Sequence, residues 1–277
     1  MWMENRDMVN HLIIAPIVLP LLAGALLVLL EKAQSRWVPT LALASTMALL
    51  WVAVLLLQAQ AGSVQVYLLG NWQAPWGIAL ALDRLSALML LLTAVVALAS
   101  LVYALGGDDR KGLHFHALLQ FQLMGLNGAF LTADLFNLFV FFEVLLAASY
   151  GLLLHGASLE RLKASVHYVA FNLAGSTLFL VAVSLLYALT GTLNMADLAV
   201  KLPQLGAENA RLAQAAVLLL VVVFGVKAAL LPLYFWLPAT YAAATASVAA
   251  LFAIMTKVGV YAIVRVSTLW TSHSDGH

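Results

Sequence analysis

Three ionisable side chains interrupt stretches of sequence that are otherwise apolar: Glu143, Lys227 and Lys257. A charged group at the centre of a lipid bilayer costs about 2.5–3.5 kcal/mol on insertion scales, so such residues are retained where they pair, lose their charge or take part in function. A carboxyl group and an amine can store a proton, because each favours the charged form of the other only while the two are close. We therefore predict that Glu143 and Lys227 form a proton-storing pair and that Lys257 receives the proton.

Structural explanations compete with this prediction. Glu143 would lie at a headgroup boundary if its helix had other limits, and the long side chains of Lys227 and Lys257 could reach the membrane surface. All three residues could also belong to a buried ion pair that has only a structural role. The sequence alone leaves these alternatives open.

Two further residues are candidates for a proton relay. Tyr261 follows Lys257 by four residues, and this spacing places both on one face of a helix. His167 precedes a set of polar residues that either extend a relay or only form hydrogen bonds between helices: Asn172, Ser176 and Thr177. His114 and His116 form a His-x-His pair without a third ligand, which is too little to predict a metal site. No glycine-rich phosphate loop or dinucleotide-binding fingerprint is present, so no cofactor site is predicted.

The composition predicts that lipid surrounds the elements that carry these residues. Hydrophobic residues make up 64% of the 277 residues and charged residues only 9%. Soluble domains are about half apolar and about a quarter charged. The net charge of +1 is uninformative about nucleic acid, and the chain has no basic tract, so no nucleic-acid partner is predicted. The chain contains no cysteine for a disulfide or a thiolate metal site.

Apolar runs of about 20 residues predict membrane-spanning helices. Eight such segments predict an all-α polytopic membrane bundle: residues 10–31, 37–59, 83–106, 113–132, 134–155, 163–190, 212–232 and 241–268. Glu4 and Asp7 precede the first run, so we interpret it as a membrane helix and not as a signal peptide. The intervening segments 60–82 and 191–211 are predicted to be an extramembrane turn region and a polar loop.

The seventh segment is predicted to be discontinuous. Pro232 and Pro238 flank the sequence Leu-Tyr-Phe-Trp-Leu, and each proline removes a backbone donor and clashes with the preceding helical turn. Irregular backbone at membrane depth survives only where protein or a water-filled cavity surrounds it, and in transport proteins a broken helix often lines the ion path.

Basic residues of the loops predict the orientation of the bundle. The connections after the first, third and fifth segments carry Lys32, Arg36, Arg110, Lys111, Arg161 and Lys163. Loops rich in Lys and Arg lie on the cytoplasmic side. We therefore predict that the N-terminus lies outside and that the chain resides in the cell (inner) membrane.

Longer stretches around the three charged residues resemble a known family. The sequence KAALLPLYFWLPATYAAATASVAALFAIMTKVGVYAIVR, which begins at Lys227, resembles the signature of the antiporter-like subunits shared by respiratory complex I and Mrp-type cation/proton antiporters. More narrowly, DRLSALMLLLTAVVAL, LMGLNGAFLTADLFNLFVFFEVLLAASYGLLLHG and VHYVAFNLAGSTLFLVAVSLLYALTGTLNMADLA are similar to the D subunit of the Mrp (also Mnh or Pha) antiporter. The similarity extends along essentially the whole chain.

The resemblance implies a fold and roles for the three charged residues. Members of the family have about fourteen helices, with two inverted five-helix repeats that each form a proton half-channel around a broken helix. The functional glutamate matches Glu143, the lysine of the broken helix matches Lys227 and the lysine of the next helix matches Lys257. This chain departs from many relatives, which carry other residues at the positions of Tyr234, Ala239, Ala244 and Ala246.

The resemblance also implies a division of the chain. Residues 1–112 would form three N-terminal helices, 113–270 the first antiporter-like repeat with helices four to eight, and 271–277 a polar tail. The second repeat is absent from this sequence.

The implied function is proton translocation in a multisubunit antiporter that exchanges Na⁺ or K⁺ for protons. Its partners would be the other subunits and the lipid bilayer, with no cofactor and no enzymatic activity. Two alternatives remain: a proton-pumping membrane subunit of an NADH:quinone oxidoreductase or related hydrogenase complex, and a truncated subunit that does not transport.

Overall fold

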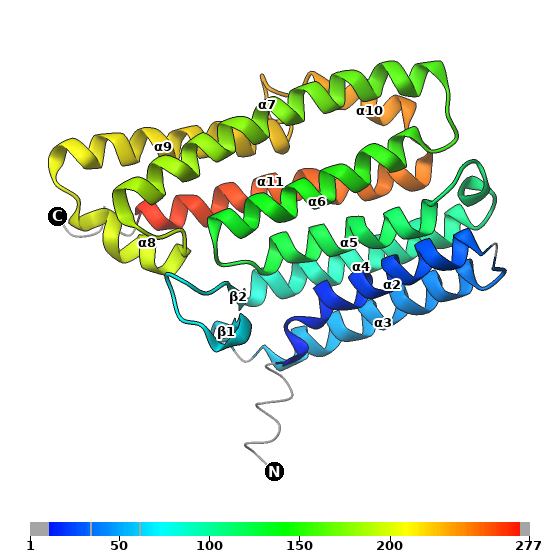
Figure 1. Cartoon of the computed structure of the whole chain (residues 1–277), viewed down its shortest axis with the longest axis horizontal. Helices are drawn as coiled ribbons and strands as arrows, with labels where there is room; N and C mark the ends of the chain where they lie inside the picture. Colours follow the sequence, from blue (N-terminus) through cyan, green and yellow to red (C-terminus); the bar gives the residue numbers. More distant parts are fainter. Residues whose placement is uncertain (1–10, 34, 61, 272–277) are drawn as a thin grey trace, which may run out of the picture.

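Long helices that lie side by side dominate the computed structural model, which describes residues 11–33, 35–60 and 62–271 (Figure 1). The long helices are α2 (Ala15–Lys32), α3 (Val38–Ala59), α4 (Arg84–Ala104), α5 (Phe115–Leu131), α6 (Leu135–Leu154), α7 (Leu159–Thr190), α9 (Ala207–Lys227) and α11 (Ala246–Thr271). Within the described part of the chain, seven of them are long and apolar enough to cross a bilayer. The eighth, α5, has 17 residues, a length of about 26 Å. The predicted all-α membrane bundle is confirmed.

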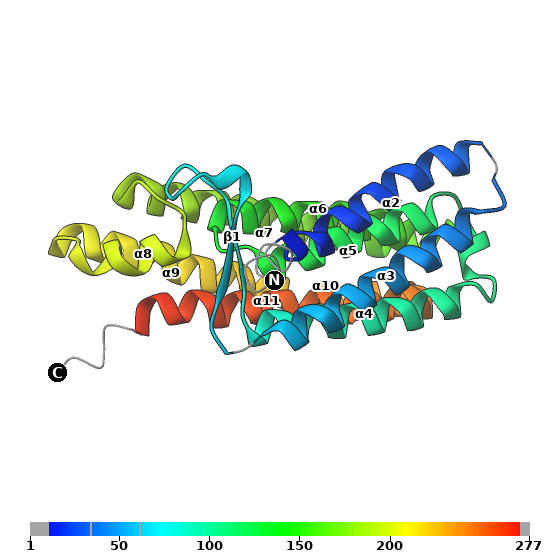
Figure 2. The same cartoon turned by 90° about the horizontal axis from the view of Figure 1, so that it is seen from below.

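Two connections contain more regular structure than the sequence predicted. In the segment 60–82, strands β1 (Gln65–Leu68) and β2 (Ala79–Leu82) form an antiparallel hairpin that crosses the end of the bundle (Figure 2). The hairpin is held to the helices through Ala133, whose N–H donates to the carbonyl of Ala79 at 2.9 Å. In the segment 191–211, Asn194 caps the short helix α8 (Met195–Lys201). Predicting only turns and loops in these segments was therefore incomplete.

The apolar pattern misplaced the starts of two helices. Helix α7 begins at Leu159 and not at residue 163, because the Ser158 hydroxyl accepts from the N–H of Arg161 at 3.2 Å. Helix α11 begins at Ala246 and not at residue 241, directly after Thr245, whose hydroxyl hydrogen-bonds that of Ser247 at 3.1 Å.

The predicted break in the seventh segment is present, but it starts earlier than expected. Helix α9 ends at Lys227, and the chain resumes as the separate helix α10 (Trp236–Ala243). Pro232 lies in the non-helical segment between them. Pro238 lies in the first turn of α10, where a helix tolerates proline. The residues predicted to end helix seven and to begin helix eight therefore belong to the break and to α10.

Helix α5 is at the centre of the bundle, where it packs chiefly between α2 and α6. Two glycines allow α6 to approach it closely. A Cβ atom on Gly125 would lie 2.7 Å from the Cβ of Leu145, and one on Gly128 would lie 2.2 Å from the Phe141 ring. The close contact of α5 with α6 fixes the position of the helix that carries Glu143.

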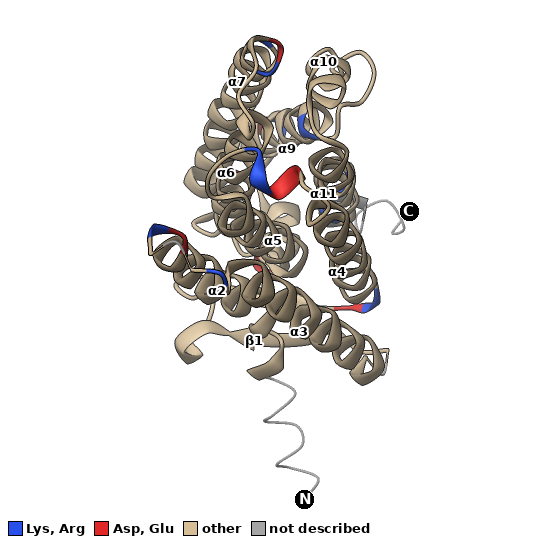
Figure 3. Ribbon diagram, turned by 90° about the vertical axis from the view of Figure 1, so that its right-hand side faces the viewer, with Lys and Arg blue, Asp and Glu red and all other residues tan. Residues whose placement is uncertain are grey.

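The loops predicted to be cytoplasmic share one end of the bundle. Figure 3 views this end, where the α2–α3, α4–α5 and α6–α7 connections lie. In this view α7 and α10 lie on one side, α2 and α3 on the other, and α5, α6, α9 and α11 between them. The grouping fits the predicted topology, while the orientation in the membrane stays a prediction.

Candidate functional site

Lys227 is the last residue of α9, and its side chain is buried with 3% exposure. A helix C-terminus carries partial negative charge, which favours a cation there. The break after Lys227 is ordered by hydrogen bonds to the last turn of α9. The N–H of Leu230 donates to the carbonyl of Gly225 at 2.9 Å, and the Trp236 indole N–H donates to the carbonyl of Val226 at 2.9 Å. The break therefore holds the ammonium group inside the bundle.

A serine hydroxyl joins the two predicted members of the proton-storing pair. The Nζ of Lys227 donates to the Ser176 hydroxyl at 2.8 Å and to the backbone carbonyl of Asn172 at 3.1 Å. The same Ser176 hydroxyl donates to Oε1 of Glu143. Glu143 and Lys227, both in the described part of the chain, form no direct ion pair. The structure thus brings them together through one bridging side chain.

Aromatic rings pack near the Lys227 end of this bridge, while Glu143 at the other end is half-buried. The Phe142 ring lies 5.8 Å from the Nζ of Lys227 and stacks on Phe224 at 6.1 Å. Phe179 contacts both of these rings edge-on. Hydrogen bonds between charged groups are stronger in such an apolar environment, and leaving one unmade is more costly.

Helix α11 packs directly against the break. A Cβ atom on Gly259 would lie 2.6 Å from the backbone nitrogen of Ala228, so only glycine allows this approach. The contact places the middle of α11 next to the residue that follows Lys227. It links the helix of Lys257 to the broken helix by backbone contact and not by a bond between the two lysines.

The structure does not bury Lys257 as the sequence predicted. Its side chain is exposed on the surface of this chain, and its Nζ lies 3.5 Å from the hydroxyl of its neighbour Thr256. The same outward stripe of α11 carries the exposed residues Val260 and Val264. Because the outward and inward faces of α11 are both apolar around this position, the apolar window did not reveal which face carries the lysine.

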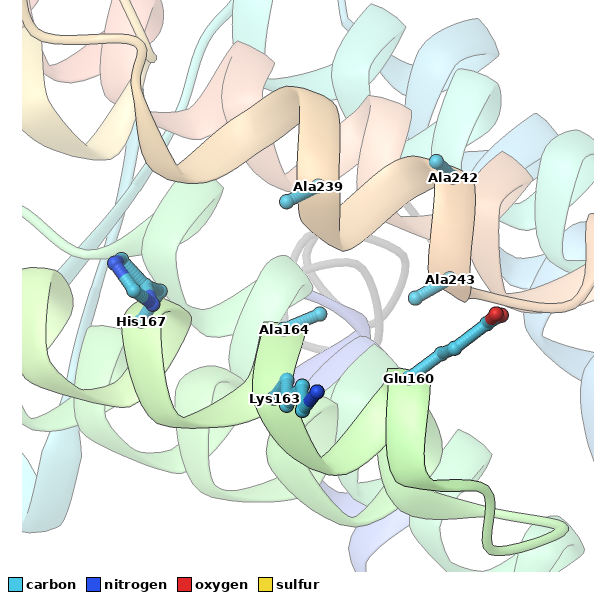
Figure 4. A pocket seen from close by; sticks show the side chains of 7 residues that line it. All are labelled: Glu160, Lys163, Ala164, His167, Ala239, Ala242 and Ala243. Carbon is cyan, nitrogen blue, oxygen red and sulfur yellow. The ribbon is translucent and has the colours of Figure 1, made fainter.

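His167 is separated from the Glu143–Lys227 site. Its exposed ring lines a cavity of about 370 Å³ between α7 and α10, together with Glu160 and Lys163 on α7 and an alanine wall on α10 (Figure 4). The structure therefore does not join His167 to the other predicted proton-transfer residues by a direct contact.

Tyr261 faces a different part of the bundle from Lys257. Its buried hydroxyl donates to the carbonyl of Phe130 at 2.8 Å and lies 3.0 Å from the Ser86 hydroxyl. It also accepts from the Nε of Arg265 at 2.9 Å. Tyr261 is buried, whereas Lys257, one helical turn earlier, is exposed, so the Tyr261 hydroxyl bonds to Ser86, Phe130 and Arg265.

An ion pair in the C-terminal part of α11 connects this helix to the start of α4. Nη2 of Arg265 lies 2.5 Å from Oδ2 of Asp83, which also caps α4 by accepting from the N–H of Ser86 at 2.7 Å. Burial raises the pKa of Asp83, but the Ser86 N–H and the Arg265 guanidinium outweigh burial, so the net pKa is lowered from its ordinary value. Asp83 therefore stays ionised at neutral pH.

The sequence did not single out Ser176 as the link between the two charges. It appeared only as one of several polar residues after His167. The i, i+4 spacing of Asn172 and Ser176 places both on one face of α7, and this spacing could have identified the face that receives Lys227.

The two histidines considered for metal binding have separate partners. His114 pairs with Glu31 at 2.6 Å and His116 with Asp109 at 3.3 Å. Within the described residues, no group of three or more His, Asp or Glu side chains has a geometry that could hold a metal ion.

Comparison with known proteins identifies relatives along the whole chain. The chain is 51% identical to a probable K(+)/H(+) antiporter D subunit of Rhizobium meliloti, over 95% of this chain and 50% of the relative. It is 42% identical to a Na(+)/H(+) antiporter D subunit of Bacillus subtilis, over 95% of this chain and 54% of the relative. The chain thus spans about half the length of the curated relatives it matches. These relatives are named as transport subunits and not as enzymes.

Solved structures share the fold. A chain of the Mrp complex from Dietzia sp. superposes with a TM-score of 0.87 at 32% identity, over 98% of this chain and 50% of that chain. A chain of respiratory complex I from Thermus thermophilus superposes with a TM-score of 0.77 at 25% identity, over 95% and 55%.

A protein-family model also matches the chain. The model for the transmembrane region of NADH:quinone oxidoreductases and Mrp antiporters matches residues 132–277, more than half of the chain. With its membrane-spanning helices and bacterial antiporter relatives, the chain is a multi-span protein of the cell membrane. It belongs to the NADH:quinone oxidoreductase/Mrp antiporter membrane-subunit family, and within that family it is similar to the antiporter D subunits.

Proposed function

We propose that this chain forms a proton half-channel of a multisubunit antiporter that exchanges Na⁺ or K⁺ for protons. The observation that carries the proposal is the continuous hydrogen-bonded connection from Glu143 through Ser176 to Lys227. It joins an acid and a base inside an apolar bundle, next to a break in a membrane helix. Few structural roles require this combination, because an apolar core of the same volume is often as stable as a buried ion pair.

The bridge allows a proton to move without rotation of a charged side chain. Lys227 passes one proton to the oxygen of Ser176 while the proton of Ser176 moves to Glu143. The ammonium becomes a neutral amine, the carboxylate becomes a carboxylic acid, and the serine regains its hydroxyl. The apolar surroundings favour the neutral pair, whereas a negative charge near Lys227 or a positive charge near Glu143 favours the ionised pair.

Lys257 would continue the path beyond this chain. It is exposed on an outward stripe with Val260 and Val264, which would face lipid in an isolated subunit. A charge in that position is costly unless protein or water covers it. We therefore propose that another part of the antiporter, such as the portion that the longer relatives possess, covers Lys257 and accepts its proton.

His167 and Tyr261 have more limited roles in this proposal. His167 lines the cavity at the end of α7, where it can exchange protons with water (Figure 4). Tyr261 holds α11 against α4 and α5 through its hydrogen bonds to Ser86 and Phe130, and so supports the position of Lys257.

A redox-driven pump is the second candidate, because chains of complex I and of an archaeal membrane-bound sulfane sulfur reductase share the fold. The higher identity to relatives named as antiporter D subunits favours exchange of cations. The two functions differ in one measurement. An antiporter dissipates an imposed proton gradient when Na⁺ or K⁺ is added, without a respiratory electron donor.

Glu143→Gln and Lys227→Met test the proposed function in everted vesicles that contain the complete antiporter. Both variants should abolish the cation-dependent dequenching of a ΔpH-sensitive dye, while the complex is still present at normal abundance. Lys201→Ala is the control, because Lys201 forms only a partly exposed ion pair with Asp197 on α8. Normal exchange by either Glu143→Gln or Lys227→Met would exclude the role proposed for that residue.

A further inference from the structure

A buried pair of titratable side chains lies at the end of the bundle that Figure 3 views, and the proton connection proposed above does not use it. The Nε2 atom of His116, in the first turn of α5, lies 3.3 Å from Oδ2 of Asp109, in the α4–α5 connection. Each of the two side chains is only 6% exposed. The pair therefore joins a loop to the central helix of the bundle through two groups that can each gain or lose a proton.

Three polar atoms of this pair and of the neighbouring His155 have no hydrogen-bond partner among the described residues. They are Oδ1 of Asp109, Nδ1 of His116 and Nδ1 of His155, and all three are buried. A buried polar atom without a partner is costly, and the cost is larger where the group is charged. The pair is thus bonded on one side and unsatisfied on the other, so a change in its protonation alters what it needs from its surroundings.

Three titratable groups act on the His116 ring. Asp109 comes from the α4–α5 connection, Glu31 from the end of α2 and His155 from the end of α6. Glu31 already pairs with the half-exposed His114 at 2.6 Å, whereas Asp109 keeps an oxygen without a partner in the described part of the chain. Of the two acids, Asp109 therefore responds more directly to the charge of His116.

Protonation of His116 changes the pair in a defined way. When Asp109 is ionised, the neutral ring donates its Nε2 proton to the carboxylate, and its Nδ1 atom is an acceptor. The protonated ring carries a second N–H at Nδ1, which meets no acceptor among the residues that the structure describes. Asp109 cannot serve both nitrogens at once, because they lie on different edges of the ring. The charged ring therefore requires water or a movement of the loop.

The same loop is bonded to the start of α11. Asp108, the residue before Asp109, accepts from the Ser247 hydroxyl in the first turn of α11 at 3.0 Å. Burial raises the pKa of Asp108, but its bonds to Lys111 and Ser247 outweigh burial and the net pKa is lowered, so this contact is made by a carboxylate at neutral pH. A movement of Asp109 therefore reaches the helix of Lys257 through one neighbouring residue.

The loop is also connected to the end of α10. The backbone carbonyl of Asp108 accepts from Nε2 of His155 at 3.0 Å. Arg161, in the first turn of α7, donates from Nη1 to the carbonyl of His155 and from Nε to the carbonyl of Ala243, the last residue of α10, at 3.0 Å. His155 and Arg161 thus link the loop to the second half of the broken helix.

We propose that the His116–Asp109 pair is a pH-sensitive contact that holds the junction of α10 and α11. The contact is closed while His116 is neutral, and protonation of His116 opens it. Opening releases the α4–α5 connection and, with it, the ends of the two helices that follow the break. Exchange then slows when this side of the membrane becomes acidic. The inference goes beyond the proposed function and rests on it only for the transport measurement.

His116→Gln tests the consequence for transport in everted vesicles that contain the complete antiporter. In the predicted orientation, this end of the bundle faces the medium. Glutamine keeps an N–H near the position of Nε2 but cannot become charged. We expect the ratio of the His116→Gln rate to the wild-type rate to rise at least about threefold between about pH 8 and about pH 5.5, the range in which histidine titrates. The ratio cancels the pH dependence that the driving force gives to both proteins.

Asp109→Asn is a second variant with its own expected result. Removal of the negative charge disfavours the protonated ring, so the acidic decline in rate should move to lower pH. His114→Gln is the matched control, because it removes a histidine that pairs with an acid at the surface. The ratio of its rate to the wild-type rate should stay constant with pH.

Several results would overturn the inference. A purely structural role of the pair would change the rate, the abundance or the thermal stability of the complex by the same factor at every pH. A constant ratio for His116→Gln therefore refutes it, and so does an equal rise for His114→Gln. A shift of the Asp109→Asn decline to higher pH refutes it as well.

Amide hydrogen exchange of the complete complex gives a measurement that does not depend on transport. At about pH 5.5, residues 243–247 should exchange more slowly in His116→Gln than in the wild type, and at about pH 8 the two should be equal. Equal exchange at both pH values overturns the inference. An active Glu143→Gln refutes the proposed function alone, and amide exchange then still tests the contact. An inactive Glu143→Gln together with a constant ratio for His116→Gln refutes the contact alone.

Discussion

Replacement of Ser176 by alanine tests the central connection with the smallest change in shape. Ser176→Ala removes the hydroxyl that accepts from Lys227 and donates to Glu143, and keeps the helix backbone. Lys227 keeps only its bond to the carbonyl of Asn172, and the carboxylate loses its donor. The vacated volume, about one oxygen atom, is too small for a replacing water. The proposed proton pathway between the two charged groups would therefore be interrupted.

The expected magnitude follows from the hydrogen bonds that are lost. A hydrogen bond to a charged group contributes about 1.5–3 kcal/mol. If this full amount is added to the barrier for proton transfer, the rate falls roughly 10- to 150-fold, at about 1.4 kcal/mol per factor of ten. The effect on folding should be smaller than for the loss of either charged partner, because both partners remain.

Cation-dependent dequenching in everted vesicles measures the rate, and Thr177→Ala supplies a matched control. Thr177 is the next residue on α7, and its hydroxyl donates only to the carbonyl of Leu173 in the same helix, at 3.0 Å. Thr177→Ala should exchange at close to the normal rate. Equal rates for Ser176→Ala and Thr177→Ala, at equal abundance of the complex, would show that the serine bridge does not carry the proton.

Two further predictions concern how α11 is held. Asp83→Asn should lower the thermal stability of the complex by about 1–3 kcal/mol, because it leaves the Arg265 guanidinium without its carboxylate. Since the pKa of Asp83 is lowered in the folded chain, its contribution is fully present above about pH 4 and is lost as the pH falls through the folded value. The difference in melting temperature should therefore be constant from pH 5 to 8, and a difference that grows across this range would contradict the assignment. Gly259→Val should disrupt the contact with Ala228 and lower both the thermal stability of the complex and the rate of cation/proton exchange. Gly206→Ala, which has open space around its Cβ, should change neither. Equal melting curves for the two variants would refute the packing argument.

The sequence was sufficient to locate Lys227 because two independent signals coincide there. A charge in an apolar run and a proline shortly after it both depend on local sequence, and both survive in the folded chain as a buried ammonium at a helix end. Glu143 followed from the first signal alone. The hydrogen-bonded link between Glu143 and Lys227 could not be predicted from the sequence. It depends on which side of α7 packs against α6 and α9, and local sequence does not determine this packing.

The position of Lys257 shows why burial could not be predicted for every charge. In a soluble helix, polar residues mark the outward face. In a membrane helix the outward face is also apolar, as Val260 and Val264 show. The mean hydropathy of a segment therefore predicts that a residue lies within the membrane, but not whether its side chain points into the bundle or toward lipid. The same limitation hid the start of α11, because the alanine-rich sequence before Thr245 resembles a continuous helix.

A serine between two opposite charges changes the energetics that a direct ion pair would have. The hydroxyl oxygen of Ser176 lies between the two charged groups, so they are about 5 Å apart instead of the roughly 3 Å of a direct ion pair. At an effective dielectric constant of about 20, attraction falls from about 5.5 kcal/mol at 3 Å to about 3.3 kcal/mol at 5 Å. Since this attraction favours the ionised form and burial favours the neutral form, the weaker attraction makes it easier for the proton to move from Lys227 to Glu143. In the proposed function, Ser176 would thus make proton transfer to Glu143 easier than direct contact between Glu143 and Lys227 would.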